Sequence, residues 1–216
     1  MTRSAALTAR RARPAATLPA SFYDRDTSIV ARELLGAVIE CVTPQGVTHS
    51  RIVETEAYLG PHDPACHAAA GLTARTKHLF GPAGTSYVYF IYGMYWCFNA
   101  VTRESGHGSA VLIRAAAPVD GLPLMHARRP HVRRDADLTN GPGKLCLALG
   151  IDGTMSGLSL QKGPLVIRAG TPVVDRDVRV TPRIGITKAA DWPQRYFVAG
   201  DPFVSRTPTS LQSRRP

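Results

Sequence analysis

The chain has 216 residues, of which 44% are hydrophobic and 19% charged, a composition typical of a soluble globular protein. This length corresponds to one domain that buries enough apolar surface to fold without a disulfide framework or a structural metal. No stretch approaches the roughly 18 apolar residues of a membrane-spanning helix, and residues 1–20 lack the apolar segment of a secretory signal.

The formal net charge of +10 is concentrated at the two ends of the chain. Residues 1–17 hold four Arg and residues 206–216 hold three, and neither segment contains an acidic residue. The remaining body, 18–205, has 19 basic and 16 acidic residues, a net charge of +3. We therefore predict one domain at 18–205 between two disordered basic tails. The first tail is also compatible with an organellar transit peptide.

The cysteines do not form a recognisable metal or disulfide pattern. None of the four belongs to a Cys-x-x-Cys pair, and the sequence predicts buried free thiols at Cys41, Cys66, Cys97 and Cys146. We expect no metal and no cofactor.

In chain order, the first predicted element is a helix over Ser28–Leu35, capped by Thr27 or Ser28 and ended by Gly36. Next comes a hairpin that turns at residues 44–46, with strands at 37–42 and 47–58. Residues 60–84 are rich in Gly and Pro and predict a long functional loop.

The second half of the chain predicts short strands joined by tight turns. We expect strands at 85–92, 95–102 and 110–115, a turn at Gly93-Met94, and further short strands near 165–167, 173–174 and 196–198. Helices are predicted at 121–129 and 145–149. The fold class is therefore α+β, a single compact domain with a curved, mainly antiparallel sheet (an open barrel or roll) and peripheral helices.

Two carboxylates make the segment 51–58 unusual. In a strand, Glu54, Glu56 and Tyr58 share one face with Ile52. A buried carboxylate is costly and persists where a partner or a function compensates for it. The alternative is an exposed polar face without a function.

An aromatic segment follows at 87–99, where five of the thirteen residues are Tyr or Trp. Tyr87 and Tyr89 share a face, whereas Tyr92 has the opposite parity and lies at the predicted hairpin tip. A ring at a tip is poorly placed for a core and well placed to enter a base stack. A pair of aromatic core strands is the alternative.

Three further segments have weaker signals. Cys66-His67 lacks the His-x-Glu and Pro-Cys-x-x-Cys pattern of the zinc nucleobase deaminases, which excludes that class. Residues 126–134 hold four Arg and two His, which fits either a solvated charge run or a phosphate contact. Gly141-Pro142-Gly143 precedes a helix, as in a helix-hairpin-helix turn or a plain helix entry.

Together these segments resemble the alkyladenine (3-methyladenine) DNA glycosylase family of the mammalian-enzyme type, from about Leu18 to Ser205. The motifs that carry the resemblance are 51–60 (RIVETEAYLG), 84–95 (GTSYVYFIYGMY), 111–114 (VLIR) and 141–146 (GPGKLC). The resemblance implies a monofunctional enzyme that flips a damaged purine out of duplex DNA, hydrolyses its N-glycosidic bond and leaves an abasic site.

The resemblance also implies roles for individual residues. Glu56 matches the general base that activates water, and Arg114 matches the arginine that positions this water. Tyr58, His67 and Tyr89 match the walls of the base pocket, and Asn99 matches the residue that crowds the amino group of normal guanine. The matches to the group inserted into the duplex are Tyr92, Met94 and Tyr95.

Two alternatives differ in class. One is a non-catalytic nucleic-acid-binding module on the same fold, which the presence of both Glu56 and Arg114 opposes. The other is a helix-hairpin-helix glycosylase, which the strand-rich middle of the chain opposes. We expect no lysine in the pocket and hence no Schiff-base chemistry.

The expected partner is double-stranded DNA that contains damaged purines. We expect a monomer that does not bind membranes, in the cytoplasm with the nucleoid if the source is bacterial, and in the nucleus or an organelle if it is eukaryotic.

Overall fold

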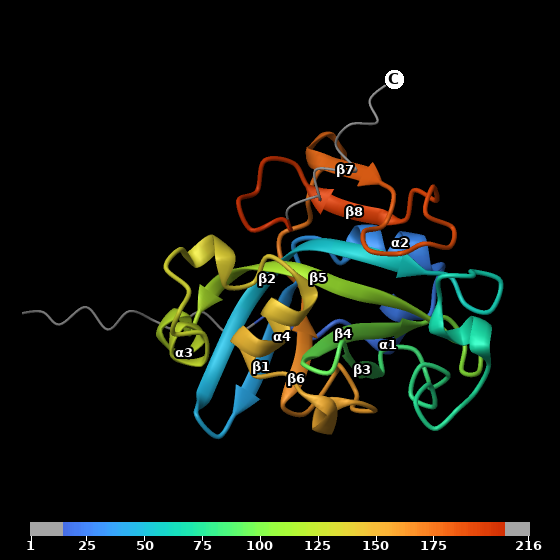
Figure 1. Cartoon of the computed structure of the whole chain (residues 1–216), viewed down its shortest axis with the longest axis horizontal. Helices are drawn as coiled ribbons and strands as arrows, with labels where there is room; N and C mark the ends of the chain where they lie inside the picture. The colour runs from blue at the N-terminus through green and yellow to red at the C-terminus, as the bar shows by residue number, and fades with distance from the viewer. Residues whose placement is uncertain (1–14, 206–216) are drawn as a thin grey trace, which may run out of the picture.

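A computed structural model describes residues 15–205 of the chain (Figure 1). Residues 1–14 of the expected tail at 1–17, and all of the expected tail at 206–216, lie outside the described residues. Residues 15–17 pair with the domain, because Thr17 bridges Arg168 and the Ala169 amide donates to the Ala16 carbonyl. Within 15–205 no helix has the length and apolar character needed to span a membrane.

One antiparallel sheet organises the molecule. Its path runs β3-β4-β5-β2-β1-β6, and β8 joins the far half of β2 and also pairs with β7. The strands are β1 (Val38–Thr43), β2 (Gly46–Tyr58), β3 (Ser86–Ile91), β4 (Tyr95–Thr102), β5 (Ser109–Asp120), β6 (Leu165–Arg168), β7 (Val178–Thr181) and β8 (Arg195–Val198).

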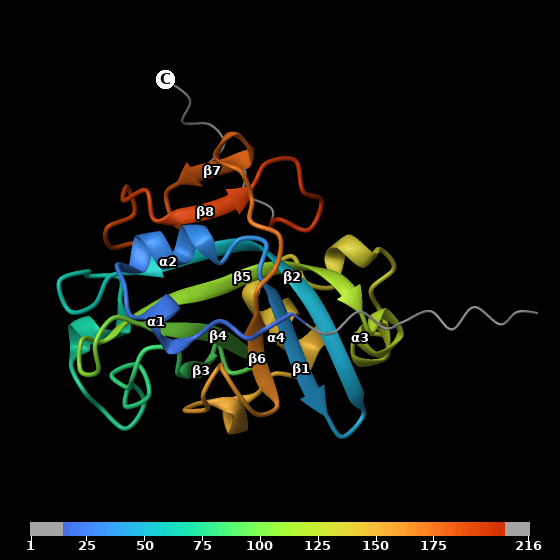
Figure 2. The same ribbon diagram turned by 180° about the vertical axis from the view of Figure 1, so that it is seen from behind.

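Short helices flank this sheet. The α-helices are α1 (Ala20–Tyr23), α2 (Thr27–Glu33), α3 (Leu122–Arg128) and α4 (Pro142–Leu149), and single 3-10 turns lie at His67–Ala70, Asp135–Asp137, Gly153–Met155 and Asp175–Asp177. Helix α4 lies in front of the sheet in Figure 1 and α3 lies at its left edge, and the reverse view in Figure 2 brings α1 and α2 to the front. The predicted α+β class, with its curved antiparallel sheet and peripheral helices, is confirmed as a half-barrel.

Most predicted elements are present with shifted ends. The β1–β2 hairpin turns at the predicted residues, β4 has the predicted bounds, and 60–84 is a loop with only one 3-10 turn. Three predictions were wrong. The cap of α2 is Asp26, whose carboxylate accepts from the Ser28 and Ile29 amides. The β3–β4 turn is centred on Tyr92-Gly93, and no strand forms at 173–174.

The pairing of β2 with β5 is irregular where the two carboxylates lie. Glu54 lies opposite Ala115 and Thr55 opposite Ile113, so Arg114 has no direct partner in the register. Such irregularities redirect side chains and recur beside active sites. Both Glu54 and Glu56 are fully buried, so the alternative of an exposed polar face is wrong.

Candidate active site

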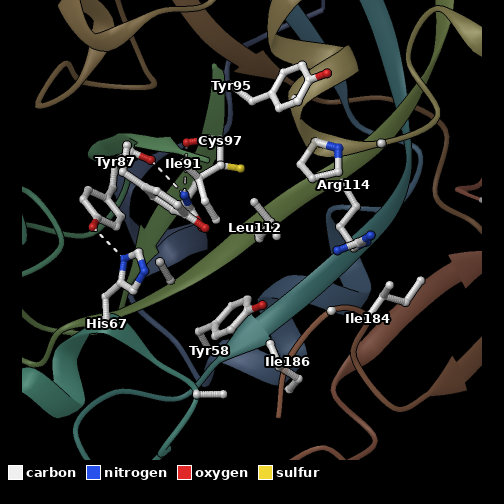
Figure 3. A pocket seen from close by; sticks show the side chains of 18 of the residues that line it. Tyr58, His67, Tyr87, Ile91, Tyr95, Cys97, Leu112, Arg114, Ile184 and Ile186 are labelled. Atoms are coloured by element: carbon white, nitrogen blue, oxygen red, sulfur yellow. Dashed lines mark hydrogen bonds between the residues drawn. The ribbon is translucent and has the colours of Figure 1, made fainter. Parts of the chain in front are cut away.

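A cavity of about 470 Å³ opens between the β3–β4 hairpin, the loop after β2, the start of α4 and the segment before β8. Figure 3 shows His67 and Tyr87 on one side of it and Arg114 and Ile184 on the other. Of the predicted site residues, the cavity is lined by Tyr58, His67, Tyr89, Tyr92, Tyr95, Asn99 and Arg114.

Glu56 does not itself line the cavity but lies directly behind residues that do. Its Oε1 accepts from the Ile184 amide at 2.7 Å. Its Oε2 accepts from the Tyr58 hydroxyl at 3.0 Å and lies 3.2 Å from Arg114 Nη1. A carboxylate oxygen has two acceptor positions, so Oε1 retains one among the described residues. The carboxylate is therefore fixed in orientation and can still accept one further hydrogen bond through Oε1.

Glu54 holds the other side of Arg114. Its Oε1 accepts from Arg114 Nε at 3.1 Å and from Arg195 Nε at 2.7 Å, and the Ser205 amide donates to its Oε2 at 2.7 Å. The buried cluster thus pairs two carboxylates with two guanidinium groups, which compensates for their desolvation.

Arg114 and Tyr58 keep their protons in this cluster. Burial would lower the pKa of Arg114, but the carboxylates of Glu56 and Glu54 more than offset it, and the pKa is raised overall. Burial raises the pKa of the Tyr58 hydroxyl well above its usual value, and the charge of Glu56 raises it further. Both groups therefore remain donors to Glu56 at neutral pH.

The opposite wall is aromatic and neutral. His67 Nδ1 lies 2.9 Å from the Tyr87 hydroxyl, and its ring meets Tyr89 edge-on with the ring centroids 4.5 Å apart. Burial lowers the pKa of His67, and the charge of Arg75 lowers it further, so the imidazole is uncharged at pH 7. The wall offers flat ring surfaces and a neutral hydrogen-bonding edge.

Asn99 lies in the cavity wall with its side chain fixed. Only 4% of the residue is exposed. Its amide nitrogen donates to the Tyr87 carbonyl at 3.0 Å, which determines how the side chain faces the cavity.

The tip of the β3–β4 hairpin is apolar and exposed. Tyr92 is 77% exposed, Met94 64% and Tyr95 41%. Tyr92 also has a φ of 54°, a left-handed conformation that is unusual for an aromatic residue. The predicted position of Tyr92 at the tip, outside the core, agrees with this exposure. Met94 is the one tip residue of the three that does not line the cavity.

Comparison with known proteins connects this site to one family. The family model of the methylpurine-DNA glycosylases matches residues 21–202. The chain belongs to this family. It is 50% identical to a protein of Myxococcus xanthus over 88% of this chain and 94% of the relative, and 50% identical to one of Methanoculleus marisnigri over 88% and 99%. A Legionella pneumophila protein is 43% identical over 88% and 98%. Each is named "Putative 3-methyladenine DNA glycosylase".

The protein is thus a DNA repair glycosylase, a hydrolase of N-glycosyl bonds, as the sequence motifs predicted. Within 15–205 no group of three or more His, Cys, Asp or Glu side chains is arranged to hold a metal ion.

One expectation about basic residues of this glycosylase was wrong, and the structure adds detail to a second. Lys144 lines the cavity, although no lysine was expected there, and its ammonium donates to Asn140 Oδ1 at 2.8 Å. In the basic segment 126–134, Arg128 donates to Ala148 and Thr43, and Arg129 donates to two carbonyls at 137 and 138. Half of its arginines are therefore used inside the fold.

Sequence reasoning missed several residues of the glycosylase site. Tyr87 lines the cavity and bonds His67, and its parity with Tyr89 was the available signal. Arg195, Ser205 and Ile184 come from the C-terminal part of the chain, far from the carboxylates in sequence. No local pattern indicates that they meet Glu54 and Glu56.

Proposed function

We propose that this glycosylase removes 3-methyladenine and related alkylated or deaminated purines from duplex DNA, after rotating the damaged nucleotide into the cavity. The observation that carries the proposal is the Glu56 carboxylate, held by Ile184, Tyr58 and Arg114 directly behind an aromatic cavity. A volume of about 470 Å³ is within the usual range for a small-molecule site.

Glu56 is the general base. A water molecule placed between its free acceptor position and C1′ of the flipped nucleotide gives a proton to the carboxylate, while its oxygen bonds to C1′. The C1′–N bond breaks, and its electron pair leaves with the base. A purine alkylated at N3 or N7 is already cationic and departs as a neutral molecule, so it needs no general acid. A deaminated purine is neutral and must gain a proton from solvent as it departs. The negative carboxylate also stabilises positive charge that develops on the sugar.

Arg114 holds the Glu56 carboxylate in its orientation. The guanidinium lies between Glu54 and Glu56 and lines the cavity, where a second N–H donor can orient the attacking water.

Tyr58, His67 and Tyr89 form the base pocket. The two tyrosine rings stack on the flipped purine, a contact worth about 1–3 kcal/mol per base. A cationic adduct is favoured on tyrosine faces for the same reason as a cation–π pair. The neutral His67 hydrogen-bonds to the edge of the base. Asn99 excludes normal guanine by crowding its amino group.

Tyr92 enters the space that the flipped nucleotide leaves, with Met94 and Tyr95 against the neighbouring bases. Their exposure at the hairpin tip supports this role. The enzyme acts as a monomer on duplex DNA, and in a prokaryotic cell it works at the nucleoid in the cytoplasm.

A panel of duplexes, each with one damaged base, tests the proposal when abasic sites are measured under single-turnover conditions. Glu56→Gln should abolish excision of the preferred lesion and leave binding close to wild type, because the amide cannot accept the proton. Glu40→Gln, at a carboxylate on β1 paired with Arg168, is the matched control and should keep full activity. A Glu56→Gln variant with more than a tenth of the wild-type rate would remove Glu56 from its role.

A further inference from the structure

A second buried ion pair lies beside the candidate active site. Asp63 in the loop after β2 and Arg183 in the segment between β7 and β8 have fully buried side chains. Both guanidinium Nη atoms donate to the carboxylate, with Nη2 2.9 Å from Oδ1. Neither residue lines the cavity.

Arg183 contacts the strand that carries Glu56. Its Nη1 donates to the Ala57 carbonyl at 3.0 Å, and its Cζ lies 4.7 Å from the centroid of the Tyr58 ring. A guanidinium over a tyrosine face is attracted to the ring, so this contact fixes the tilt of Tyr58. The hydroxyl of that same ring donates to Glu56.

The residue after Arg183 contacts Glu56 directly. The Ile184 amide donates to Glu56 Oε1 at 2.7 Å, and Ile184, Gly185 and Ile186 form part of the cavity wall. Arg183 is therefore the anchor that holds this segment, and its backbone N–H donor, against the carboxylate.

Asp63 extends the connection to the opposite wall. Its carboxylate accepts from the Leu59 and Ala65 amides at 3.1 and 3.0 Å. Its backbone carbonyl accepts from the Cys66 amide at 2.9 Å, one residue before His67. One buried pair thus ties together the loop that leads to His67 and the segment that holds Glu56.

Stability alone is a weak explanation for this pair. Two buried charges lose their hydration, and an apolar pair of similar volume is often at least as stable. Arg183 Nε is also buried without a hydrogen-bond partner among the described residues, which adds a cost. Unsatisfied buried groups in native proteins call for a functional account.

We propose that Asp63 and Arg183 form a positioning pair that fixes the Ile184 amide and the Tyr58 ring against Glu56. The inference rests on the proposed role of Glu56 as the general base. Arg183 acts through its neighbours and touches neither substrate nor water.

Two variants test the pair while preserving its volume. Arg183→Lys keeps the positive charge beside Asp63 but loses the planar fork and the flat face over Tyr58. Asp63→Asn keeps the shape and an acceptor but loses the charge, and it carries the test if the lysine variant fails to fold. Arg168→Lys is the matched control, because Arg168 makes the same two-pronged contact with Glu40 on the β1–β6 side of the sheet.

Three quantities are compared in full-length protein: the single-turnover excision rate, Kd for a lesion duplex, and the Ile184 amide signal in ¹⁵N-resolved NMR. Arg183→Lys and Asp63→Asn should lower the excision rate at least tenfold, change Kd less than threefold, and shift the Ile184 amide while accelerating its hydrogen exchange. Arg168→Lys should leave the excision rate and Kd within twofold of wild type, and the Ile184 amide signal unshifted.

Either of two results overturns the inference. One is an excision rate within twofold of wild type in a folded pair variant, and the other is a slow variant with an unchanged Ile184 amide. Glu56→Gln, measured in parallel, separates this failure from failure of the proposed function. If Glu56→Gln abolishes excision while Arg183→Lys does not slow it, only the positioning pair is wrong.

Discussion

At the residue scale, the proposed role of Asn99 depends on a side chain that is buried and hydrogen-bonded in one orientation. Its amide nitrogen is committed to the Tyr87 carbonyl, so the side chain cannot turn away from a base that enters the cavity. The amino group of a guanine in the cavity would then collide with a side chain that cannot move aside.

We predict that Asn99→Ala and Asn99→Ser raise the removal of normal guanine relative to 3-methyladenine, because the obstruction becomes smaller. The two bases released from alkylated genomic DNA are quantified by chromatography. Excision of 3-methyladenine by the variants serves as the internal control. An unchanged ratio of guanine to methyladenine would show that discrimination lies elsewhere in the pocket.

Tyr92 combines exposure with backbone strain. A non-glycine residue in a sparsely populated backbone region costs about 1–3 kcal/mol, and a ring that is 77% exposed recovers little of this by burial. Asn tolerates the left-handed region better than Tyr does. The strained tyrosine is therefore a disadvantage to the fold, which supports a role for its ring outside the fold.

Tyr92→Asn should accordingly leave the free energy of unfolding unchanged or raise it by up to about 1 kcal/mol, in urea unfolding. Excision from duplex DNA should fall sharply, because nothing opposes return of the flipped nucleotide. The same lesion in a single strand should lose much less activity, since it has no partner strand to return to. A large loss of stability would mean instead that Tyr92 is a core residue.

At the scale of elements, local patterns predicted what local chemistry determines. The 44–46 turn residues and the strand-forming composition of 95–102 specify β1–β2 and β4, because turn chemistry and strand propensity act over a few positions. The end of β5 was placed too early, since Ala115 to Asp120 continue a strand whose extension depends on pairing with β2. Val173-Val174 has strand propensity but no strand to pair with.

The residues of the candidate site also fall into two groups, those that a local sequence pattern predicts and those that depend on contacts between distant parts of the chain. Glu56, Tyr58, Tyr89 and Asn99 lie within motifs that a single stretch of sequence reveals. Arg195, Ser205 and Ile184 reach the carboxylates only because β8 joins the far half of β2 and the chain then returns at Ser205. Such contacts span more than a hundred residues, and the sequence contains no periodic signal for them.

The cap of α2 gives a test at this scale. Asp26 accepts from two first-turn amides and replaces the predicted Thr27 or Ser28. Asp26→Ala should lower the free energy of unfolding by about 1 kcal/mol, as measured by urea denaturation. Ser28→Ala, two residues further along the chain, is the control for the alternative cap. An Asp26→Ala variant as stable as wild type would show that Asp26 is not the cap. A loss of stability in Ser28→Ala would not by itself assign the cap to Ser28, because the Ser28 hydroxyl also donates to Gln194 Oε1.

At the scale of the whole molecule, both ends of the described chain are tied to it. The Ala16 carbonyl accepts from the Ala169 amide next to β6, and Ser205 donates its amide and its hydroxyl to Glu54 in the buried cluster around Arg114. A truncation at the C-terminal end must therefore keep Ser205, and one at the N-terminal end must keep residues 15–17.

The distribution of charge gives the last prediction. The body at 18–205 has a net charge of only +3, whereas residues 1–14 contain four Arg and no acid.

We predict that these arginines contact phosphates, and that deleting residues 1–14 lowers the slope of log Kd against log salt by up to about 4 units, at about 0.9 per neutralised phosphate. The single-turnover rate at saturating enzyme should not change, because the described residues that line the cavity come from 58–186. Replacing the four Arg with Gln at full length should give the same slope as the deletion, since counterion release depends on charge and not on chain length. An unchanged slope in both variants would mean that the segment does not touch DNA, and targeting of the protein would then be its better explanation.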